Sequence, residues 1–424
     1  MTGTAEALLQ RRRRILALAG ASGWMVLGRG SGLAWMLFLV ASVGLGDYGL
    51  YAMAFAAAAL LAAPSENIFL VRSVRVDAAT YAAERSARTL LGLALVAVGA
   101  AVYAWSFVAG LALLIAGGEM LFNAVKSRAL RAGEPMLPMR WDAVRQVSSI
   151  AAAVGLWFLA GERLPLELLM LAYVLPYLVV AVVAVRGIRG VRPRWPRGAR
   201  GQLLLVGDAV ITALYLQGDI LLLGLLLGDE VVGAYAIASQ LVLAASIVGQ
   251  LLGQQYTASL REAGGRRHGG PPLGLTVALG AVMTSGTAGV GGVLLLDPGT
   301  AQVGVLLLIL APFAGLRSVS NAWVTALYVL GVDRRRVLGA GAALLLRAVC
   351  LAVVILAGVA GGLAAAIAAV AGEVLLVVLF AAVLRGAYAS AGTTADHPAG
   401  TAPDALDDAP VPAPLRGTAG EGQA

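Results

Sequence analysis

The stretch "LGDYGLYAMA" at residues 45–54 recurs in altered form as "LGDEVVGAYAIA" at residues 227–238. Both copies contain Leu-Gly-Asp followed by Gly-x-Tyr-Ala-x-Ala. A second pair of phrases, "NAVKSRALRAG" at 123–133 and "NAWVTALYVLG" at 321–331, follows in the same order. Two motifs that recur in the same order predict a chain made of two similar halves. The small residues of the first motif favour a role in close helix packing over direct contact with a substrate.

Composition indicates the environment in which these halves fold. Of the 424 residues, 60% are hydrophobic and 13% are charged, whereas about 25% of the residues of a soluble domain are charged. The chain contains twelve apolar runs, each close to the roughly 20 residues that cross a bilayer as a helix. Such long continuous runs exclude a membrane barrel, whose strands are shorter and alternate. The runs lie near 15–43, 49–71, 89–105, 107–125, 143–160, 166–185, 202–227, 231–257, 273–296, 302–330, 337–358 and 362–384.

The charges in the loops predict the orientation. Arginine clusters such as Arg11–Arg14 and Arg334–Arg336 fall in alternate loops, and the other loops carry mainly acidic residues such as Asp229 and Asp297. Because cytoplasmic loops are enriched in basic residues, both termini are predicted to be cytoplasmic. Each half then has six spans and enters the membrane from the same side, which makes the repeat parallel. The predicted fold is an all-α polytopic membrane protein of two six-helix bundles.

This organisation divides the chain into five segments. They are a basic cytoplasmic N-terminus (1–14), an N-terminal six-helix bundle (15–185), a basic cytoplasmic linker (186–200), a C-terminal six-helix bundle (201–385) and a cytoplasmic tail (386–424). The tail is rich in Ala, Pro, Gly and Asp, which predicts disorder. The net charge of +8 suits the anionic inner leaflet and makes membrane lipids, and not nucleic acid, the expected partner.

The residues that carry chemistry exclude several classes of protein. The only cysteine, Cys350, lies in a span, and the two histidines, His268 and His397, lie in a loop and in the tail. We therefore expect no metal site and no histidine-based catalysis in the membrane. The chain has no GxxxxGKS/T phosphate loop, which argues against ATP hydrolysis. The outer loops are short, so a membrane-embedded glycosyltransferase or polymerase is disfavoured, and we expect no enzyme.

The first motif, together with "GDILLLGLLLGDEVVGAYAIASQLV" at 218–242, resembles the polysaccharide flippases, the Wzx-type transporters of the multidrug/oligosaccharidyl-lipid/polysaccharide exporter superfamily. The resemblance implies two bundles arranged as a V around a cavity that opens alternately to either side. It implies movement of an undecaprenyl-diphosphate-linked oligosaccharide across the bacterial plasma membrane, driven by an ion gradient or the membrane potential. A coupling Na⁺ or H⁺ would be the only cofactor, and a glycan polymerase and glycosyltransferases of the same pathway would be partners.

Ionisable residues inside spans are costly and therefore mark candidate sites. Arg29, Arg317 and Arg347 are candidates for a cationic cavity, because a guanidinium forks onto a diphosphate with charge-assisted hydrogen bonds. The alternative for Arg29 and Arg317 is that they snorkel to the interface or pair with an acid. Arg347 is predicted to pair with Glu373 on the adjacent span.

Acidic and amide side chains supply the remaining candidates. Asp219, Glu373 and Glu66 are candidates for ion coupling. Glu66 follows Pro64, and this part of the span is expected to be broken and to line a hydrated wall. Gln250 and Gln254 are candidates for contact with sugar hydroxyls, although glutamines also join helices by hydrogen bonds.

Other functions remain open at this level. A multidrug exporter of the same superfamily would favour an acidic, aromatic cavity for cationic drugs, whereas the spans here are no less basic than acidic. A lipid II flippase usually has two additional spans. A scaffold without transport activity would not require buried charges in so many spans.

Overall fold

The computed structural model describes residues 23–24, 27–131, 136–161, 164–196, 199–263 and 265–393. Over these ranges every regular element is a helix. Eleven of the helices are long and apolar enough to cross a membrane, and one further apolar helix, Leu27–Val43, is shorter. The predicted all-α class and span count are therefore confirmed for this part of the chain. The predicted N-terminal segment 1–14 lies outside it.

Each half of the chain supplies its own group of helices. The N-terminal group consists of Leu27–Val43, α2 (Leu45–Arg75), α3 (Ala78–Val102), α4 (Phe107–Arg131), α5 (Met136–Ala160), α6 (Leu166–Val174) and α7 (Pro176–Arg186). The C-terminal group consists of α8 (Ala199–Leu226), α9 (Asp229–Gln255), α10 (Thr257–Glu262), the short 3-10 helix Arg267–Gly269, α11 (Leu273–Leu294), α12 (Ala301–Val329), α13 (Asp333–Leu356) and α14 (Gly361–Thr393).

Equivalent helices occupy equivalent places in the two groups. Helix α4 packs against α2 and α3, and α12 packs against α9 and α11. Each of these central helices begins its last turns with the repeated Asn-Ala phrase. Asn123 of α4 donates a hydrogen bond to Glu66 of α2, and Asn321 of α12 donates one to the carbonyl of Ser246 of α9. The second repeated motif therefore ties each central helix to the second helix of its own half.

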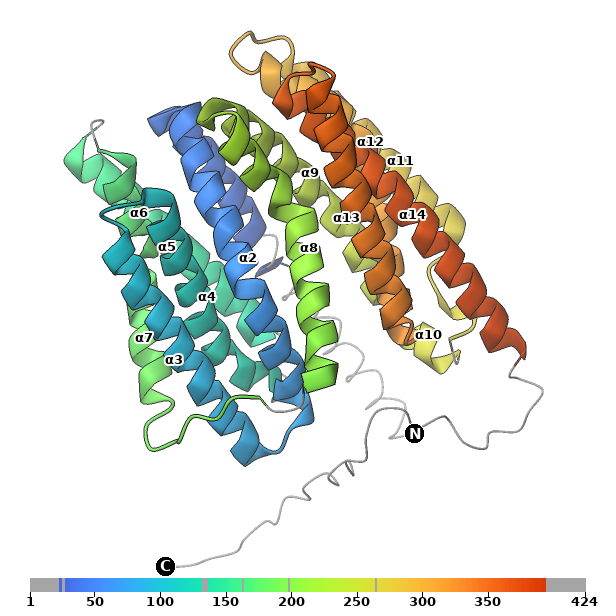
Figure 1. Ribbon diagram of the computed structural model, residues 1–424, viewed down its shortest axis with the longest axis horizontal. Coiled ribbons are helices and arrows are strands. Elements are labelled where there is room, and N and C mark those ends of the chain that lie inside the picture. Colours follow the sequence, from blue (N-terminus) through green and yellow to red (C-terminus); the bar gives the residue numbers. More distant parts are fainter. Residues whose placement is uncertain are drawn as a thin grey trace, which may run out of the picture.

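The two groups meet through α2, which packs against both α8 and α9. In Figure 1 the helices α3–α7 lie on one side of this contact and α11–α14 lie on the other. Gly49 of α2 and Gly233 of α9 lie in it, and a Cβ atom on either residue would overlap a backbone carbonyl of the other helix. The packing role predicted for the first motif is thus confirmed, since the missing side chains let the two backbones touch.

Proline affects the helices differently from the prediction. The sixth predicted span is two helices, because Pro176 has no amide hydrogen and the chain turns at Leu175. In contrast, α2 continues through Pro64 and Glu66, so the predicted break there is wrong. A membrane helix can tolerate a proline in its interior, and α2 does so at Pro64.

The last helix is longer than predicted. Helix α14 continues to Thr393, so the disorder predicted from residue 386 is wrong over 386–393, and 394–424 lie outside the described residues. Tyr388 on this extension packs beside a buried cluster that contains Leu260. Through this contact the end of α14 packs against an apolar cluster, which stabilises the additional helical turns.

The predicted linker between the halves lies against the N-terminal group. The Ser86 hydroxyl of α3 donates to the Val191 carbonyl at 3.3 Å, and the backbone amide of Arg194 donates to the Ala83 carbonyl at 3.1 Å. The rings of Trp195 and Phe69 are 6.2 Å apart. The described part of the linker is therefore attached to α2 and α3.

Candidate functional site

A buried ion pair joins α8 and α13 in the C-terminal group. Nε of Arg347 lies 2.9 Å from Oδ2 of Asp219, and Arg347 also donates to the carbonyl of Tyr215 at 2.7 Å. The hydroxyl of Tyr235, from the repeated motif in α9, donates to the same Asp219 oxygen at 2.6 Å. Arg347 is 4% exposed and Asp219 is 6% exposed. Both charges are thus enclosed, and besides each other they are hydrogen-bonded to two further residues, Tyr215 and Tyr235.

A second pair lies next to the first. Glu373 of α14 is fully buried and accepts hydrogen bonds from the hydroxyls of Tyr215, at 2.7 Å, and Ser320, at 2.5 Å. Arg317 of α12 lies 3.5 Å from the Glu373 carboxylate. The guanidinium groups of Arg317 and Arg347 lie 5.4 and 5.1 Å from the centre of the Tyr215 ring. Tyr215 therefore connects the two pairs into one network.

The predicted pairing of Arg347 with Glu373 is wrong. The neighbouring residue Gly372 is the one that faces Arg347, because a Cβ atom there would lie 3.1 Å from Cβ of Arg347. Successive helical residues are rotated by about 100°, so Glu373 points away from α13 and toward α12. Sequence spacing placed the two charges on adjacent helices but did not determine their rotation.

A small cavity adjoins this network. It has a volume of about 10 Å³ and is lined by Tyr215, Tyr235, Ser239 and Arg347 together with apolar side chains. This volume is close to the space that one water molecule needs. The network can therefore hold a water molecule, but the cavity is much too small for a lipid head or a sugar.

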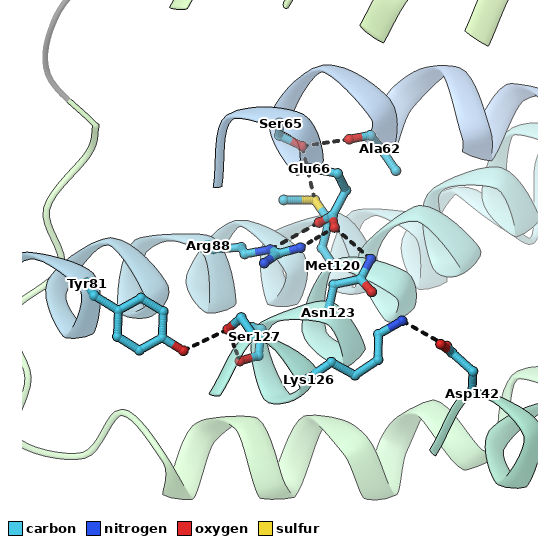
Figure 2. Close-up of polar contacts among 11 residues, drawn as sticks. Ala62, Ser65, Glu66, Tyr81, Arg88, Met120, Asn123, Lys126, Ser127 and Asp142 are labelled. Carbon is cyan, nitrogen blue, oxygen red and sulfur yellow. Dashed lines mark hydrogen bonds and ion pairs between the residues drawn. The ribbon is translucent and has the colours of Figure 1, made fainter. Parts of the chain in front are cut away.

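A second polar network lies in the N-terminal group (Figure 2). Glu66 of α2 accepts hydrogen bonds from Nε of Arg88 at 3.0 Å and from Asn123 of α4 at 2.6 Å. The hydroxyls of Tyr81 and Ser127 lie 2.8 Å apart and join α3 to α4. The predicted ion-coupling residue Glu66 is thus held by an arginine and an asparagine.

A neighbouring set of polar contacts joins α4 to α5 and α7. Glu119 accepts a hydrogen bond from the Tyr177 hydroxyl at 2.6 Å and lies 3.1 Å from the Arg145 guanidinium. About two turns further along α4, Nζ of Lys126 lies 2.8 Å from Oδ1 of Asp142 on α5. Figure 2 shows the Lys126 side chain extended toward Asp142.

The remaining predicted site residues lie apart from both networks. Arg29, Gln250 and Gln254 are exposed. Among the described residues none of the three has a side-chain hydrogen bond or ion pair. The three candidates for a cationic cavity therefore divide into one exposed arginine, Arg29, and two that are paired with acids, Arg317 and Arg347.

Several members of the networks were not among the predicted site residues. Tyr215 and Tyr235 could not be separated from apolar core by periodicity, although Tyr235 belongs to the repeated motif. Arg145 lay too near the predicted inner end of its span to be distinguished from an interfacial anchor. Lys126 could have been singled out from the sequence, because it is the only lysine among the 31 Lys and Arg residues.

Comparison with known proteins identifies the fold. No protein-family model matches the chain, and no curated protein matches it in sequence. The lipid II flippase MurJ in an inward closed conformation is similar in structure, with a TM-score of 0.65 at 10% identity over 90% of each chain. A MATE in complex with MaL6 has a TM-score of 0.54 at 12% identity, over 89% of this chain and 97% of that chain. The eukaryotic MATE transporter AtDTX14 has a TM-score of 0.50 at 14% identity, over 89% of this chain and 99% of that chain.

These likenesses show that the chain shares the fold of a lipid II flippase and of MATE transporters. At such low identity they concern the fold alone.

Proposed function

We propose that the protein is a flippase that moves an undecaprenyl-diphosphate-linked oligosaccharide across the bacterial plasma membrane. Transport would proceed by alternating access of the two helix groups and would be driven by an ion gradient or the membrane potential. The fold supports this proposal, since the structure with a TM-score of 0.65 is by name a lipid II flippase. The positive-inside pattern of the loops supports cytoplasmic termini.

One observation carries the choice of an anionic substrate. Among the described residues, each carboxylate that lies well inside a spanning helix has a cationic partner within ion-pair distance. These carboxylates are Glu66, Glu84, Glu119, Asp142, Asp208, Asp219 and Glu373. A cationic drug would need at least one acid that is available to it, because a cation entering the membrane interior must be neutralised.

The exposed candidates suit the two parts of a lipid-linked sugar. Arg29 is exposed, and its planar guanidinium can donate two parallel hydrogen bonds to a diphosphate. Gln250 and Gln254 are exposed on the inner end of α9, and an amide can both donate to and accept from a sugar hydroxyl. We assign the diphosphate to Arg29 and the glycan to the two glutamines. A glycan polymerase and glycosyltransferases of the same pathway would then be functional partners.

Reconstituted vesicles test the proposal directly. Purified protein is placed in liposomes with undecaprenyl diphosphate that carries one N-acetylglucosamine, and the outward movement of the sugar is followed with a membrane-impermeant lectin. We expect lectin binding to rise beyond the fraction initially exposed, and the same liposomes should not accumulate or release the cationic dye ethidium. Movement of ethidium without movement of the lipid would instead establish a multidrug-type exporter.

A further inference from the structure

A small polar cavity lies inside the N-terminal group, between α2, α3 and α4. Tyr81, Glu84, Arg85 and Arg88 of α3 line it, together with Ser127 of α4 and side chains of α2. Figure 2 shows three of these residues, Tyr81, Arg88 and Ser127. The cavity has a volume of about 10 Å³, which is close to the space that one water molecule needs. It can therefore hold a single particle of about that size.

Arg85 brings a buried donor to this cavity. The residue is 9% exposed, and its guanidinium donates to the carbonyl of Gly187, the residue directly after α7. Its Nε is buried and has no hydrogen-bond partner in the described part of the chain. A buried N–H group without an acceptor costs free energy. The chemistry of Arg85 therefore calls for one further acceptor at the cavity.

The acids near the cavity are already neutralised by other arginines. Both carboxylate oxygens of Glu84 lie 2.9 Å from Nε of Arg72. Glu66 accepts a hydrogen bond from Nε of Arg88 at 3.0 Å. Arg85 forms no ion pair with any carboxylate of the described residues. Its positive charge is therefore left without a counter-charge, and a buried charge of this kind is costly.

A second such cation lies close to Arg85. Arg131, at the end of α4, donates to the carbonyl of Ser73 at 2.6 Å. The guanidinium carbons of Arg131 and Arg85 lie 4.9 and 5.8 Å from the centre of the Tyr81 ring. Within the described ranges Arg131 also has no carboxylate partner. Two like charges on one ring repel each other, and an anion beside them would reduce that repulsion.

We propose that this cavity binds one chloride ion, which accepts the hydrogen bond from Nε of Arg85. A water molecule accepts the same hydrogen but leaves the charge of Arg85 unbalanced, whereas chloride satisfies both needs. A phosphate or a carboxylate contains several heavy atoms, which a space suited to one water molecule does not admit. Because Arg85 also donates to the Gly187 carbonyl, bound chloride stabilises the attachment of α3 to the start of the linker. This site does not depend on the proposed flippase function.

The first experiment measures the unfolding temperature of the full-length protein in detergent while sodium chloride replaces sodium gluconate at constant ionic strength. We expect a rise of roughly 1–3 °C for each tenfold increase in chloride above its dissociation constant, because a ligand of the folded state stabilises it logarithmically. Bromide should act in the same way. Arg85→Gln should abolish the rise, and Arg128→Gln, which removes the same charge from an exposed position on α4, should keep it. An equal rise in both variants would overturn the proposal.

The second experiment uses the wild-type protein, because Arg85→Gln also removes the hydrogen bond to Gly187. Crystals grown in sodium bromide are measured at the bromine absorption edge, where anomalous scattering distinguishes bromide from water. We expect an anomalous peak next to Nε of Arg85. A water molecule at that position, or a peak without any halide dependence of the unfolding temperature, would overturn the proposal. Neither experiment involves transport, so the outcome for this site is separate from the outcome of the lectin assay.

Discussion

Gly49 of α2 and Gly233 of α9 occupy reciprocal positions in the contact between the two halves. A Cβ atom on Gly49 would overlap the carbonyl of Asp229, and a Cβ atom on Gly233 would overlap the carbonyl of Leu45. Each copy of the repeated motif thus supplies the small residue that the backbone of the other copy requires. The repeat is therefore a requirement of the contact between halves as well as a sign of duplication.

Enlarging either glycine should weaken this contact. We expect Gly49→Val and Gly233→Val each to lower the free energy of unfolding by at least the roughly 1–3 kcal/mol typical of an overpacked site, because backbone atoms would have to move. Thermal unfolding in detergent measures the effect. Gly286→Ala in α11 is the matched control, since a Cβ atom there would contact nothing within 4 Å. Equal stability of the valine variants and this control would contradict the assignment.

Loss of one partner of the Arg347–Asp219 ion pair should destabilise the protein more than replacement of both partners. Removing one partner leaves a buried charge uncompensated, so Arg347→Ala should cost about 3–5 kcal/mol of unfolding free energy. Replacing both residues, with Arg347→Met and Asp219→Leu, should restore much of that loss, because apolar side chains of similar volume replace two buried charges. Unfolding of the two variants under identical conditions makes the comparison. A double variant less stable than the single one would show that the network has a further role.

Two of the three predicted substrate arginines, Arg29 and Arg317, should behave differently from each other. Arg29 is exposed, so Arg29→Ala should leave stability unchanged and slow transport more than tenfold, as expected from losing about 1.5–3 kcal/mol of charge-assisted hydrogen bonding. Arg317 is the cationic partner of buried Glu373, so Arg317→Ala should lower the unfolding temperature. The lectin assay and thermal unfolding are measured on the same preparations. A stable Arg317→Ala protein with no transport would return Arg317 to the substrate site.

Crosslinks distinguish parts that move together from parts that separate. Ala83 and Arg194 are joined by a backbone hydrogen bond, so cysteines at these two positions, joined by a short crosslinker, should leave transport intact. Gly46 and Glu230 lie across the contact between halves, where a Cβ atom on Gly46 would be 3.7 Å from Cγ of Glu230. Cysteines at 46 and 230 should block transport when joined. Both pairs are made in a Cys350→Ala background, and lectin binding before and after reduction gives the result. Unimpeded transport by the second pair would exclude separation of the halves there.

The sequence by itself determined the membrane environment, the helical class and the division into two halves. These features depend on local runs of apolar residues, on loop charge and on repeated phrases, each of which is readable along the chain. It also identified most of the charges inside the spans. The local sequence pattern was less reliable at the prolines. The chain breaks into two helices at Pro176 but stays one helix through Pro64, and the side chains around each proline decide which of the two results.

Only the tertiary structure decided which charges meet. Arg347 binds Asp219 and not Glu373, although Glu373 lies on the adjacent helix. Partner choice depends on the rotation of each helix about its axis, and a shift of one residue turns a side chain by about 100°. Lys126 likewise stands out in the sequence as the single lysine, but its pairing with Asp142 follows from the packing of α4 beside α5. Apolar runs fix that a helix crosses the membrane, whereas side-chain packing fixes the direction in which its charges point.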